Sequence, residues 1–244
     1  MQAPHPPLHS YYRSESDRSA WVRDCFDRSA PDYDRLERIL GLGTGSRYRR
    51  RALRAAGLGT GMSVLDIGSG TGLLASAAAS IVGDPKLVVG MDPSPGMIAH
   101  ARVPAGLRLL SGSAEQIPAA DSSADFLCMG YALRHVGDLS AAFGEFHRVL
   151  RPGSRLCILE ITVPAGRIRR ALLKTWLHGA VPRIATLVAS QREAPLLMRY
   201  YWDTIAACVP PHTVLAAIAA AGFSDVTRRV ELGMFSAYCA RRAA

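Results

Sequence analysis

The stretch Val64-Leu65-Asp66-Ile67-Gly68-Ser69-Gly70-Thr71-Gly72 decides the fold of this chain. It predicts a short apolar strand that ends in an acid, then a glycine loop, then a helix from about Thr71. Glycines let a backbone turn tightly and approach a ligand closely. Leu73 stands where the dinucleotide fingerprint Gly-x-Gly-x-x-Gly has its third glycine, so the spacing differs from that fingerprint.

The acid of this stretch indicates the charge of the ligand. A carboxylate at Asp66 would repel a pyrophosphate in a cleft of low dielectric. It would attract a cationic ligand instead. The alternative interpretation is a glycine turn that joins a strand to a helix and binds nothing.

A second acid supports the first. The run from Lys86 to Asp92 predicts another apolar strand that ends in a carboxylate, 20 residues after Gly72 (92 − 72). An acid at about this distance from a glycine loop accepts hydrogen bonds from ribose hydroxyls. Ser94 and Pro95 predict the start of the next helix, which Asp92 could also cap.

Length and composition predict one sizeable globular domain. The chain has 244 residues, of which 49% are hydrophobic and 20% charged. Its apolar runs fall short of the ~20 residues that span a bilayer, and its N-terminus lacks the apolar core of a signal peptide. We therefore expect a cytoplasmic protein. Five scattered cysteines and the spacing of the histidines predict neither a disulfide framework nor a metal site.

The net charge of +9 is concentrated in two arginine clusters, at 47–54 and at 167–174. Either cluster could be a solvated helix face or could contact anionic lipid headgroups at the inner membrane face. Nucleic acid is a less favoured partner, because aromatic residues are not interleaved with the basic runs. The sequence leaves the oligomeric state open, with a homodimer as one option.

The chain divides into a tail over residues 1–15, disordered or loosely docked, and a single domain over residues 16–244. N-terminal helices are expected over residues 16–57, and a helical insertion that could cover a substrate over residues 163–210. Between and after them, strands and helices alternate. The expected helices are 17–29, 32–40, 46–56, 71–82, 94–102, 138–150 and 211–221; the expected strands are 62–67, 86–92, 107–111, 124–130, 154–161, 225–231 and 234–241.

This alternation predicts an α/β fold with a mostly parallel sheet and helices on both of its faces. Ligands of such sheets bind at the carboxyl ends of the strands. Asp66 and Asp92 are both expected at that edge.

Several segments resemble, in order and over nearly the whole chain, the ubiquinone/menaquinone biosynthesis C-methyltransferase family. The glycine motif is similar to the first motif of the class I S-adenosylmethionine (SAM) dependent methyltransferases to which that family belongs. The other matching segments are Phe26-Asp27, Ala30 to Leu36, Ile39 to Gly43, Gly112 to Pro118, Asp121 to Phe126, Gly130 to Val136, Arg148 to Gly153, Leu159-Glu160, Tyr200 to Ile205 and Ala221 to Phe223.

The resemblance implies a Rossmann-like methyltransferase fold with a seven-stranded sheet and SAM as the cofactor. The residues it implies for cofactor binding are Tyr33, Asp66, Gly68, Gly70, Gly72, Asp92, Pro93, Met97, Ser113, Ala114, Glu115 and Gly130. The substrate would be a quinol or related aromatic molecule, methylated on carbon or oxygen. Its expected contacts are Tyr131, Glu160, Trp176, Tyr200 and Tyr201. The alternative for the last three is that they pack as ordinary helical core and bind nothing.

Two neighbouring residues are the candidates for catalysis. Arg134 is the family's candidate by resemblance, and a guanidinium can stabilise a phenolate but cannot act as a base at neutral pH. His135 has an ordinary pKa near 6.5 and could accept a proton. The alternatives are a surface ion pair between Arg134 and Asp138, a structural role for His135, and packing or helix capping for Glu160.

The chain departs from the family pattern at three positions. Glu37 and His135 stand where the family has Asn, and Ser113 stands where it has Asp beside the adenine. These departures leave two further functions open. A relative that modifies quinones could transfer the amino group of SAM instead of its methyl group, and a protein without catalysis could bind SAM alone.

Overall fold

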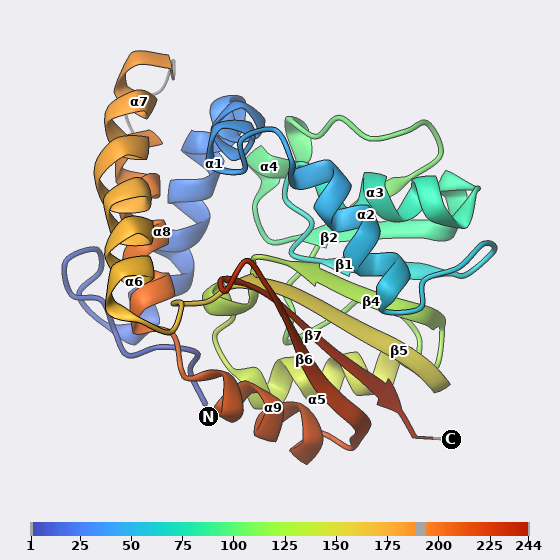
Figure 1. Ribbon diagram of the computed structural model, residues 1–244. Helices are drawn as coiled ribbons and strands as arrows, with labels where there is room; N and C mark the ends of the chain where they lie inside the picture. Colours follow the sequence, from blue (N-terminus) through green and yellow to red (C-terminus); the bar gives the residue numbers. More distant parts are fainter. Residues whose placement is uncertain (1, 189–193, 244) are drawn as a thin grey trace.

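The computed structural model describes residues 2–188 and 194–243, which form a central sheet covered by helices (Figure 1). The strands are β1 (Val64–Ile67), β2 (Val88–Asp92), β3 (Arg108–Ser111), β4 (Ala124–Gly130), β5 (Leu150–Ile161), β6 (Phe223–Glu231) and β7 (Phe235–Arg242). The α-helices are α1 (Glu15–Leu40), α2 (Gly45–Ala55), α3 (Leu73–Val82), α4 (Pro95–Ala99), α5 (Leu139–Val149), α6 (Arg167–Lys174), α7 (Val181–Val188), α8 (Ala194–Ala207) and α9 (Pro211–Ala220). Short 3₁₀ turns η1 (Pro85–Leu87) and η2 (Leu133–His135) and a π-helical turn η3 (Thr175–Ala180) complete the elements.

The sheet has the strand order β3-β2-β1-β4-β5-β7-β6. The first five strands in the chain run parallel, and β7 pairs antiparallel with both β5 and β6. The chain order reverses direction at β1 and β4, and in such sheets ligands bind at the strand ends beside this switch point. The prediction of a seven-stranded, mostly parallel sheet is confirmed.

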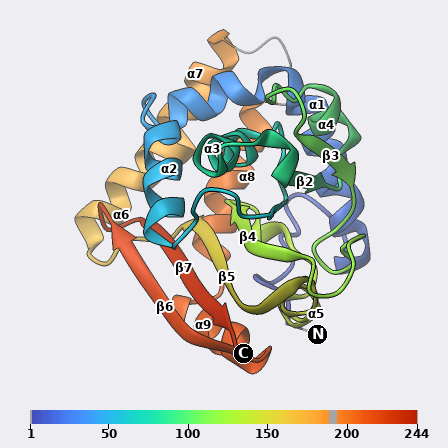
Figure 2. The ribbon, with the colours of Figure 1, turned by 90° about the vertical axis from the view of Figure 1, so that its right-hand side faces the viewer.

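Each face of the sheet buries its own core. Helices α2 and α3 cover one face through Leu53 and the alanines of α3, and α5 and α9 cover the other through Phe143, Phe146 and Ile218 (Figures 1 and 2). The small side chains of α3 let it lie close to β1 and β4. A strand buried on both faces is normally apolar throughout, so the carboxylate of Asp66 departs from the pattern expected for packing alone.

A third helical layer closes the carboxyl ends of the parallel strands. Helices α1, α7 and α8 pack together there around Val181, Leu197 and Tyr200 (Figure 1). Among the described helices none is long and apolar enough to cross a bilayer alone, whereas Pro195–Ala207 and Pro211–Ala220, bent by 75°, meet the length and composition test as a pair.

The structure corrects the expected element boundaries in several places; for example, Lys86 and Leu87, expected in a strand, belong to the 3₁₀ turn η1. Helix α1 is continuous through Pro31, where two helices were expected. Its packing against α4 and α8 outweighs the ~3 kcal/mol cost of an interior proline. Helix α4 ends at Ala99, and β5 begins at Leu150 and continues past Gly153, whose φ is +80°, with a break in its register on β4 between Leu150 and Arg155.

The tail expected to be disordered or loosely docked is held in place over residues 2–14 by specific contacts. The backbone N–H of Leu139 donates to the carbonyl of Gln2, and that of Val209 donates to Pro4. The Tyr11 hydroxyl donates to Asp203 at 2.5 Å, and Tyr12 is buried. Buried aromatic side chains and paired backbone groups hold this segment in place. Its polar composition, from which the prediction was made, does not reveal such contacts.

Helix α1 is held over the strand ends by Asp27, and removing this carboxylate tests that contact. Its Oδ1 accepts hydrogen bonds from the Ser94 hydroxyl at 2.6 Å and the Gly96 N–H at 2.7 Å. Asp27→Ala should lower the free energy of unfolding by about 1–3 kcal/mol, because two donors lose their partner. Denaturant unfolding measures this.

The matched control is Asp24→Ala on the same helix. Asp24 pairs with Arg28, and both side chains are more than half exposed. Its loss should change the free energy of unfolding by no more than ~0.5 kcal/mol. Equal effects of the two substitutions would show that Asp27 does not anchor the helix.

Candidate active site

Asp66 lies near the carboxyl end of β1 and is fully buried. Its Oδ1 accepts from the Cys128 thiol at 3.6 Å, and its Oδ2 has no hydrogen-bond partner within the described residues. Burial raises the pKa of this carboxyl to about 7. An unpartnered buried carboxylate oxygen is costly, so this position fits a ligand that donates a hydrogen bond or carries positive charge.

Asp92 ends the neighbouring strand β2 and fixes the glycine loop. Its Oδ2 accepts from the Gly70 N–H at 2.7 Å, and its Oδ1 accepts from the Ser94 N–H at 2.8 Å. Burial raises the pKa of Asp92 to about 6. A carboxylate has about four acceptor positions, so two remain for the hydroxyls of a sugar.

Gly70 is the glycine of the loop that faces open space. Its φ is +56°, and a Cβ at this position would meet nothing within 4 Å. At the other three predicted glycines a Cβ would meet a side chain instead: Ala132 for Gly68 at 2.6 Å, Val103 for Gly72 at 2.2 Å, and Leu74 for Gly130 at 3.0 Å. Packing therefore accounts for those three, and only Gly70 leaves room for a ligand to approach.

Apart from Tyr33, which lies on α1, the remaining predicted cofactor residues follow β2 and β3, with one exception in role. Pro93 and buried Met97 follow β2, and Ser113 and Ala114 follow β3. The carboxylate of Glu115, by contrast, accepts hydrogen bonds from the backbone of Gly137 at 2.6 Å and of Asp138 at 3.4 Å. Those two bonds give Glu115 a structural task, the support of the turn before α5.

A cavity of about 1070 Å³ lies beside the carboxyl ends of β4 and β5. Residues from α1, α2, η3, α6, α8 and the β6–β7 turn surround it. Its lining includes Tyr33, Glu37, Leu40, Tyr48, Tyr131, Ile161, Leu172, Leu173, Trp176, Leu177, Tyr201, Met234 and Phe235. Three of the predicted substrate contacts, Tyr131, Trp176 and Tyr201, are thus brought together; apolar and aromatic side chains make the cavity suited to a flat hydrophobic ring.

Tyr131 carries backbone strain at the edge of this cavity. Its φ is +61°, an uncommon conformation for a bulky residue. The strain is held by a hydrogen bond from its N–H to Leu159 at 2.7 Å and one to its carbonyl from Arg134 at 2.8 Å. Strained residues of this kind concentrate at functional sites.

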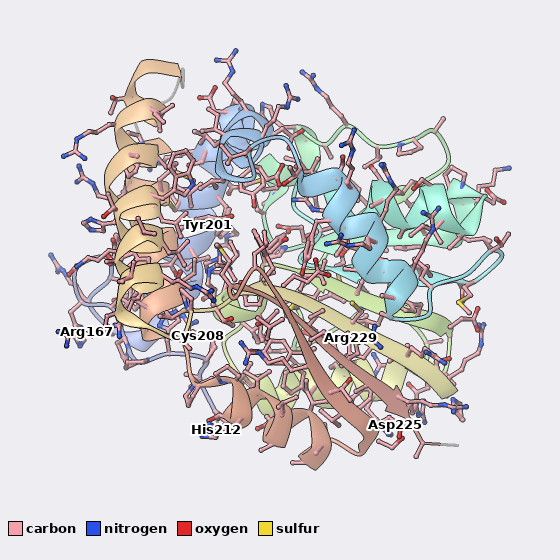
Figure 3. The ribbon with its side chains drawn as sticks, in the orientation of Figure 1. Arg167, Tyr201, Cys208, His212, Asp225 and Arg229 are labelled. Carbon is pink, nitrogen blue, oxygen red and sulfur yellow. The ribbon has the colours of Figure 1, made fainter. Side chains whose placement is uncertain are left out.

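Two tyrosine hydroxyls meet in the cavity. The hydroxyls of Tyr33 and Tyr201 lie 2.7 Å apart, and burial raises the pKa of both phenols. Both are therefore protonated at neutral pH. One of the two hydroxyl protons forms the hydrogen bond between the tyrosines, so the other proton can be donated to a further acceptor. Figure 3 shows Tyr201 between the helical layer and the sheet.

Arg134 lies behind the cavity wall, fully buried and paired with Glu160. Its Nη1 is 2.5 Å from Glu160 Oε1, its Nε donates to Thr204, and its guanidinium lies 4.5 Å from the ring centroid of Tyr201. Burial lowers and Glu160 raises the pKa of Arg134, with a net increase, so it stays a cation. The alternative of a surface ion pair between Arg134 and Asp138 is therefore wrong, because Arg134 pairs with Glu160 inside the protein. Glu160, a predicted substrate contact, does not line the cavity.

His135 and Tyr200 face away from the cavity. The His135 ring lies 5.5 Å from Tyr200 and 5.2 Å from Phe26, and Tyr200 packs on Tyr11 and Trp21. Burial lowers the pKa of His135 well below its ordinary value. A base with such a pKa holds protons poorly near pH 7, which weighs against His135 as the acceptor. Tyr200 and Tyr201 diverge because adjacent helix residues point about 100° apart.

Glu37 is a cavity residue for which no role was predicted. Its Oε1 accepts from Arg49 Nη2 at 2.6 Å, and Arg49 is buried with its guanidinium 5.7 Å from the Tyr131 ring centroid. The position stood out as a departure from the family pattern, and it lies four residues after Tyr33 on the same face of α1. Those two signals together mark Glu37 as a candidate site residue.

Asp34, next to Tyr33, accepts from the Thr71 hydroxyl at 2.5 Å and couples α1 to the glycine loop.

The fold and this edge define a class I SAM-dependent methyltransferase. A buried unpartnered carboxylate, a second acid beside the glycine loop and an open approach at Gly70 fit a ligand with cationic groups and sugar hydroxyls. Across residues 2–188 and 194–243, no group of three or more His, Cys, Asp or Glu side chains is arranged to hold a metal.

Comparison with known proteins agrees. The model of the ubiE/COQ5 methyltransferase family matches residues 13–240, and this chain belongs to that family. It is 32% identical over 231 residues to a ubiquinone/menaquinone biosynthesis C-methyltransferase of Rubrivivax gelatinosus, covering 93% of this chain and 89% of the relative. It is 34% identical to a demethylmenaquinone methyltransferase of Mycolicibacterium paratuberculosis, with 94% and 98% covered. A SAM-dependent methyltransferase from Thermotoga maritima has a similar fold, with a TM-score of 0.63, 19% identity, and 91% and 99% covered.

The protein is therefore an enzyme that uses SAM as its methyl donor. Asp66, Asp92 and Gly70 are the residues that would hold SAM, with Pro93, Met97, Ser113 and Ala114 nearby.

Gly70 provides a test of this site with an internal control. Gly70→Ala should lower the affinity for SAM at least tenfold, because the added Cβ occupies the space open to the ligand. Gly61→Ala is the control, since Gly61 also has a positive φ, of +76°, with nothing within 4 Å. Both variants carry the same backbone strain, about 1–2 kcal/mol. Calorimetry that finds equal losses of SAM affinity in both would contradict the assignment.

The raised pKa of Asp66 predicts how SAM binding depends on pH. A cationic ligand binds the ionised carboxylate, which forms as the pH rises through about 7. The affinity for SAM should therefore increase from pH 5.5 to 8, by up to about tenfold per pH unit below the pKa. Asp66→Asn should bind weakly and with a flatter pH profile. A wild-type affinity that stays constant over this range would contradict the role of Asp66.

Proposed function

We propose that this enzyme methylates a quinol or a closely related aromatic ring. The observation that carries the proposal is the aromatic and apolar cavity beside the ends of β4 and β5, since β4 neighbours β1, the strand that holds Asp66. The relatives in R. gelatinosus and M. paratuberculosis, both methyltransferases of quinone biosynthesis, support the same substrate class.

The cavity matches such a molecule in shape and polarity. Tyr33, Tyr131 and Tyr201 bound its inner end, next to β4, and supply flat surfaces and hydroxyl donors. Leu172, Leu173, Leu177 and Met234 extend the lining outward and suit an apolar tail. Aromatic rings also stack favourably with one another at centroid distances of 4.5–7 Å.

The residues at the inner end also supply the polar chemistry. Bound SAM supplies an electrophilic methyl group on a sulfonium. As the substrate hydroxyl ionises, its proton passes to the Glu37 carboxylate, and the negative charge on its oxygen is stabilised by the free hydroxyl proton of the Tyr33–Tyr201 pair. SAM, held by Asp66, Asp92 and Gly70, would supply its methyl group to the ring carbon or oxygen and leave as S-adenosylhomocysteine; after methylation on carbon, the ring would regain its aromaticity by losing the proton of that carbon.

Arg134 acts through the residues around it. Its guanidinium holds the Tyr131 carbonyl and lies against the Tyr201 ring, so it fixes two walls of the cavity. It also contributes positive charge behind the Tyr201 hydroxyl. We therefore assign Arg134 to positioning, where the family resemblance suggested contact with the substrate.

The experiment that tests the function uses purified protein, SAM with an isotopically labelled methyl group, and a water-soluble quinol with an unmethylated ring position. The product should carry the label once, by mass analysis. A product that gains the amino group of SAM, or no product from any quinol or phenol tested, would contradict the proposal.

Glu37 provides the sharpest test of the proton transfer. Glu37→Gln keeps the shape of the side chain but cannot accept a proton, and kcat should fall by about 10²–10⁴-fold. Its SAM affinity should stay near that of the wild type, because Glu37 lines the cavity and Asp66 and Asp92 do not. Glu231→Gln is the matched control, since Glu231 also lines the cavity but sits at its rim beside Arg51. Equal kcat values for Glu37→Gln and wild type would remove Glu37 from the reaction.

A further inference from the structure

Four large apolar side chains protrude around the mouth of the cavity. Leu42, Ile168, Leu172 and Leu232 are 75%, 77%, 65% and 79% exposed, the highest values among the exposed large hydrophobic residues of the described chain. They come from three separate segments: the turn after α1, helix α6, and the β6–β7 turn. Leu42, Leu172 and Leu232 also line the cavity itself. Figure 2 shows α6, the β6–β7 turn and α2 along one side of the molecule.

Two of these leucines occupy turn positions that leucine does not favour. Leu42 has a φ of +47° and Leu232 a φ of +52°, and each precedes a glycine. This left-handed conformation favours glycine or asparagine and is strained for a bulky side chain. Neither local turn geometry nor burial explains a leucine there. Contact with something outside the molecule does explain it.

Basic side chains surround the same mouth. Arg47, Arg51 and Arg169 line the cavity, and Arg167, Arg170 and Lys174 lie on α6. The carboxylate at the rim, Glu231, is paired with Arg51. Arg167 extends outward from α6 in Figure 3. The surface thus combines protruding apolar tips with an excess of positive charge, which is complementary to an anionic apolar surface.

We propose that this mouth surface, formed by Leu42, Ile168, Leu172, Leu232 and the surrounding arginines, docks on an anionic lipid bilayer. This proposal rests on the proposed function, because a quinol with an apolar tail resides in the bilayer. The apolar tips enter the boundary between headgroups and acyl chains, and the arginines contact anionic headgroups. The cavity then opens toward the lipid, and the substrate can pass between them without crossing water.

The lipid is favoured over a protein partner by the shape of the surface. The four apolar side chains are separate tips around an opening, and they do not form a continuous face that a partner helix could cover. Helix α6 presents exposed Ile168 and Leu172 between basic residues, as helices that lie in a membrane interface do.

The experiment measures co-sedimentation of the full-length protein with vesicles of phosphatidylglycerol and with vesicles of phosphatidylcholine. Wild type should bind the anionic vesicles, less tightly at high salt, and bind the neutral vesicles weakly. Leu42→Asn with Leu232→Asn should lower binding at least tenfold. Asparagine tolerates positive φ, so the variant should fold with an unchanged or higher unfolding midpoint.

Matched controls lie on β3, at the opposite edge of the sheet. Leu110→Asn removes an apolar residue that is 38% exposed there and should bind like wild type.

The charge of the docking surface is tested in the same way. Arg167→Ser with Arg170→Ser should lower binding about fivefold for each arginine. Arg102→Ser with Arg108→Ser removes the same charge from exposed positions near β3 and should have a smaller effect.

Either of two results would overturn the docking surface: no binding of wild type to anionic vesicles at low salt, or equal binding by wild type and the Leu42/Leu232 variant. Labelled methyl transfer to the water-soluble quinol is measured separately on the same preparations. If that transfer is intact while vesicle binding is absent, the docking proposal fails and the proposed function stands. If the transfer itself is absent, the proposed function fails.

Discussion

The buried ion pair between Arg134 and Glu160 joins the sheet to the helices that enclose the cavity. Glu160 lies near the end of β5, Arg134 follows β4, and the guanidinium reaches Thr204 and Tyr201 on α8. Removing one partner of such a pair leaves an uncompensated buried charge, which typically costs 3–5 kcal/mol. The third helical layer therefore depends on a polar interaction for its attachment to the sheet, whereas the rest of the core is held by apolar contacts.

The same pair connects stability to function. It holds Tyr131 in a strained conformation through its carbonyl, and it lies against the ring whose hydroxyl meets Tyr33. Helix α1 completes the arrangement, because Asp27 and Asp34 attach it to the loops after β2 and β1. Methyl transfer needs the nucleophile and the methyl group in line, and this alignment can supply about 7–11 kcal/mol of the barrier. Attachment of both sides of the cavity to one sheet edge is the arrangement by which this chain would hold the two groups in line.

Local sequence patterns predicted the parts of the fold that local physics controls. The strand at 64–67, the glycine loop and the acid at 92 follow from apolar runs and turn residues. Long-range contacts decided the parts that were missed. The continuation of α1 through Pro31, the use of Glu115 by the backbone at Gly137, and the divergence of Tyr200 from Tyr201 depend on which elements meet. The pairing of Arg134 with Glu160, 26 residues apart in the chain, could not be read from either residue's neighbours.

A crystal structure of the protein with S-adenosylhomocysteine and a quinone tests the central claim most directly. The ring should lie in the cavity between Tyr33, Tyr131 and Tyr201, with one oxygen in hydrogen-bond contact with Glu37 or with the paired tyrosine hydroxyls. A ring atom should face the sulfur across the space that a methyl group would occupy. A ring bound outside this cavity, or one whose reactive positions all point away from the sulfur, would contradict the account.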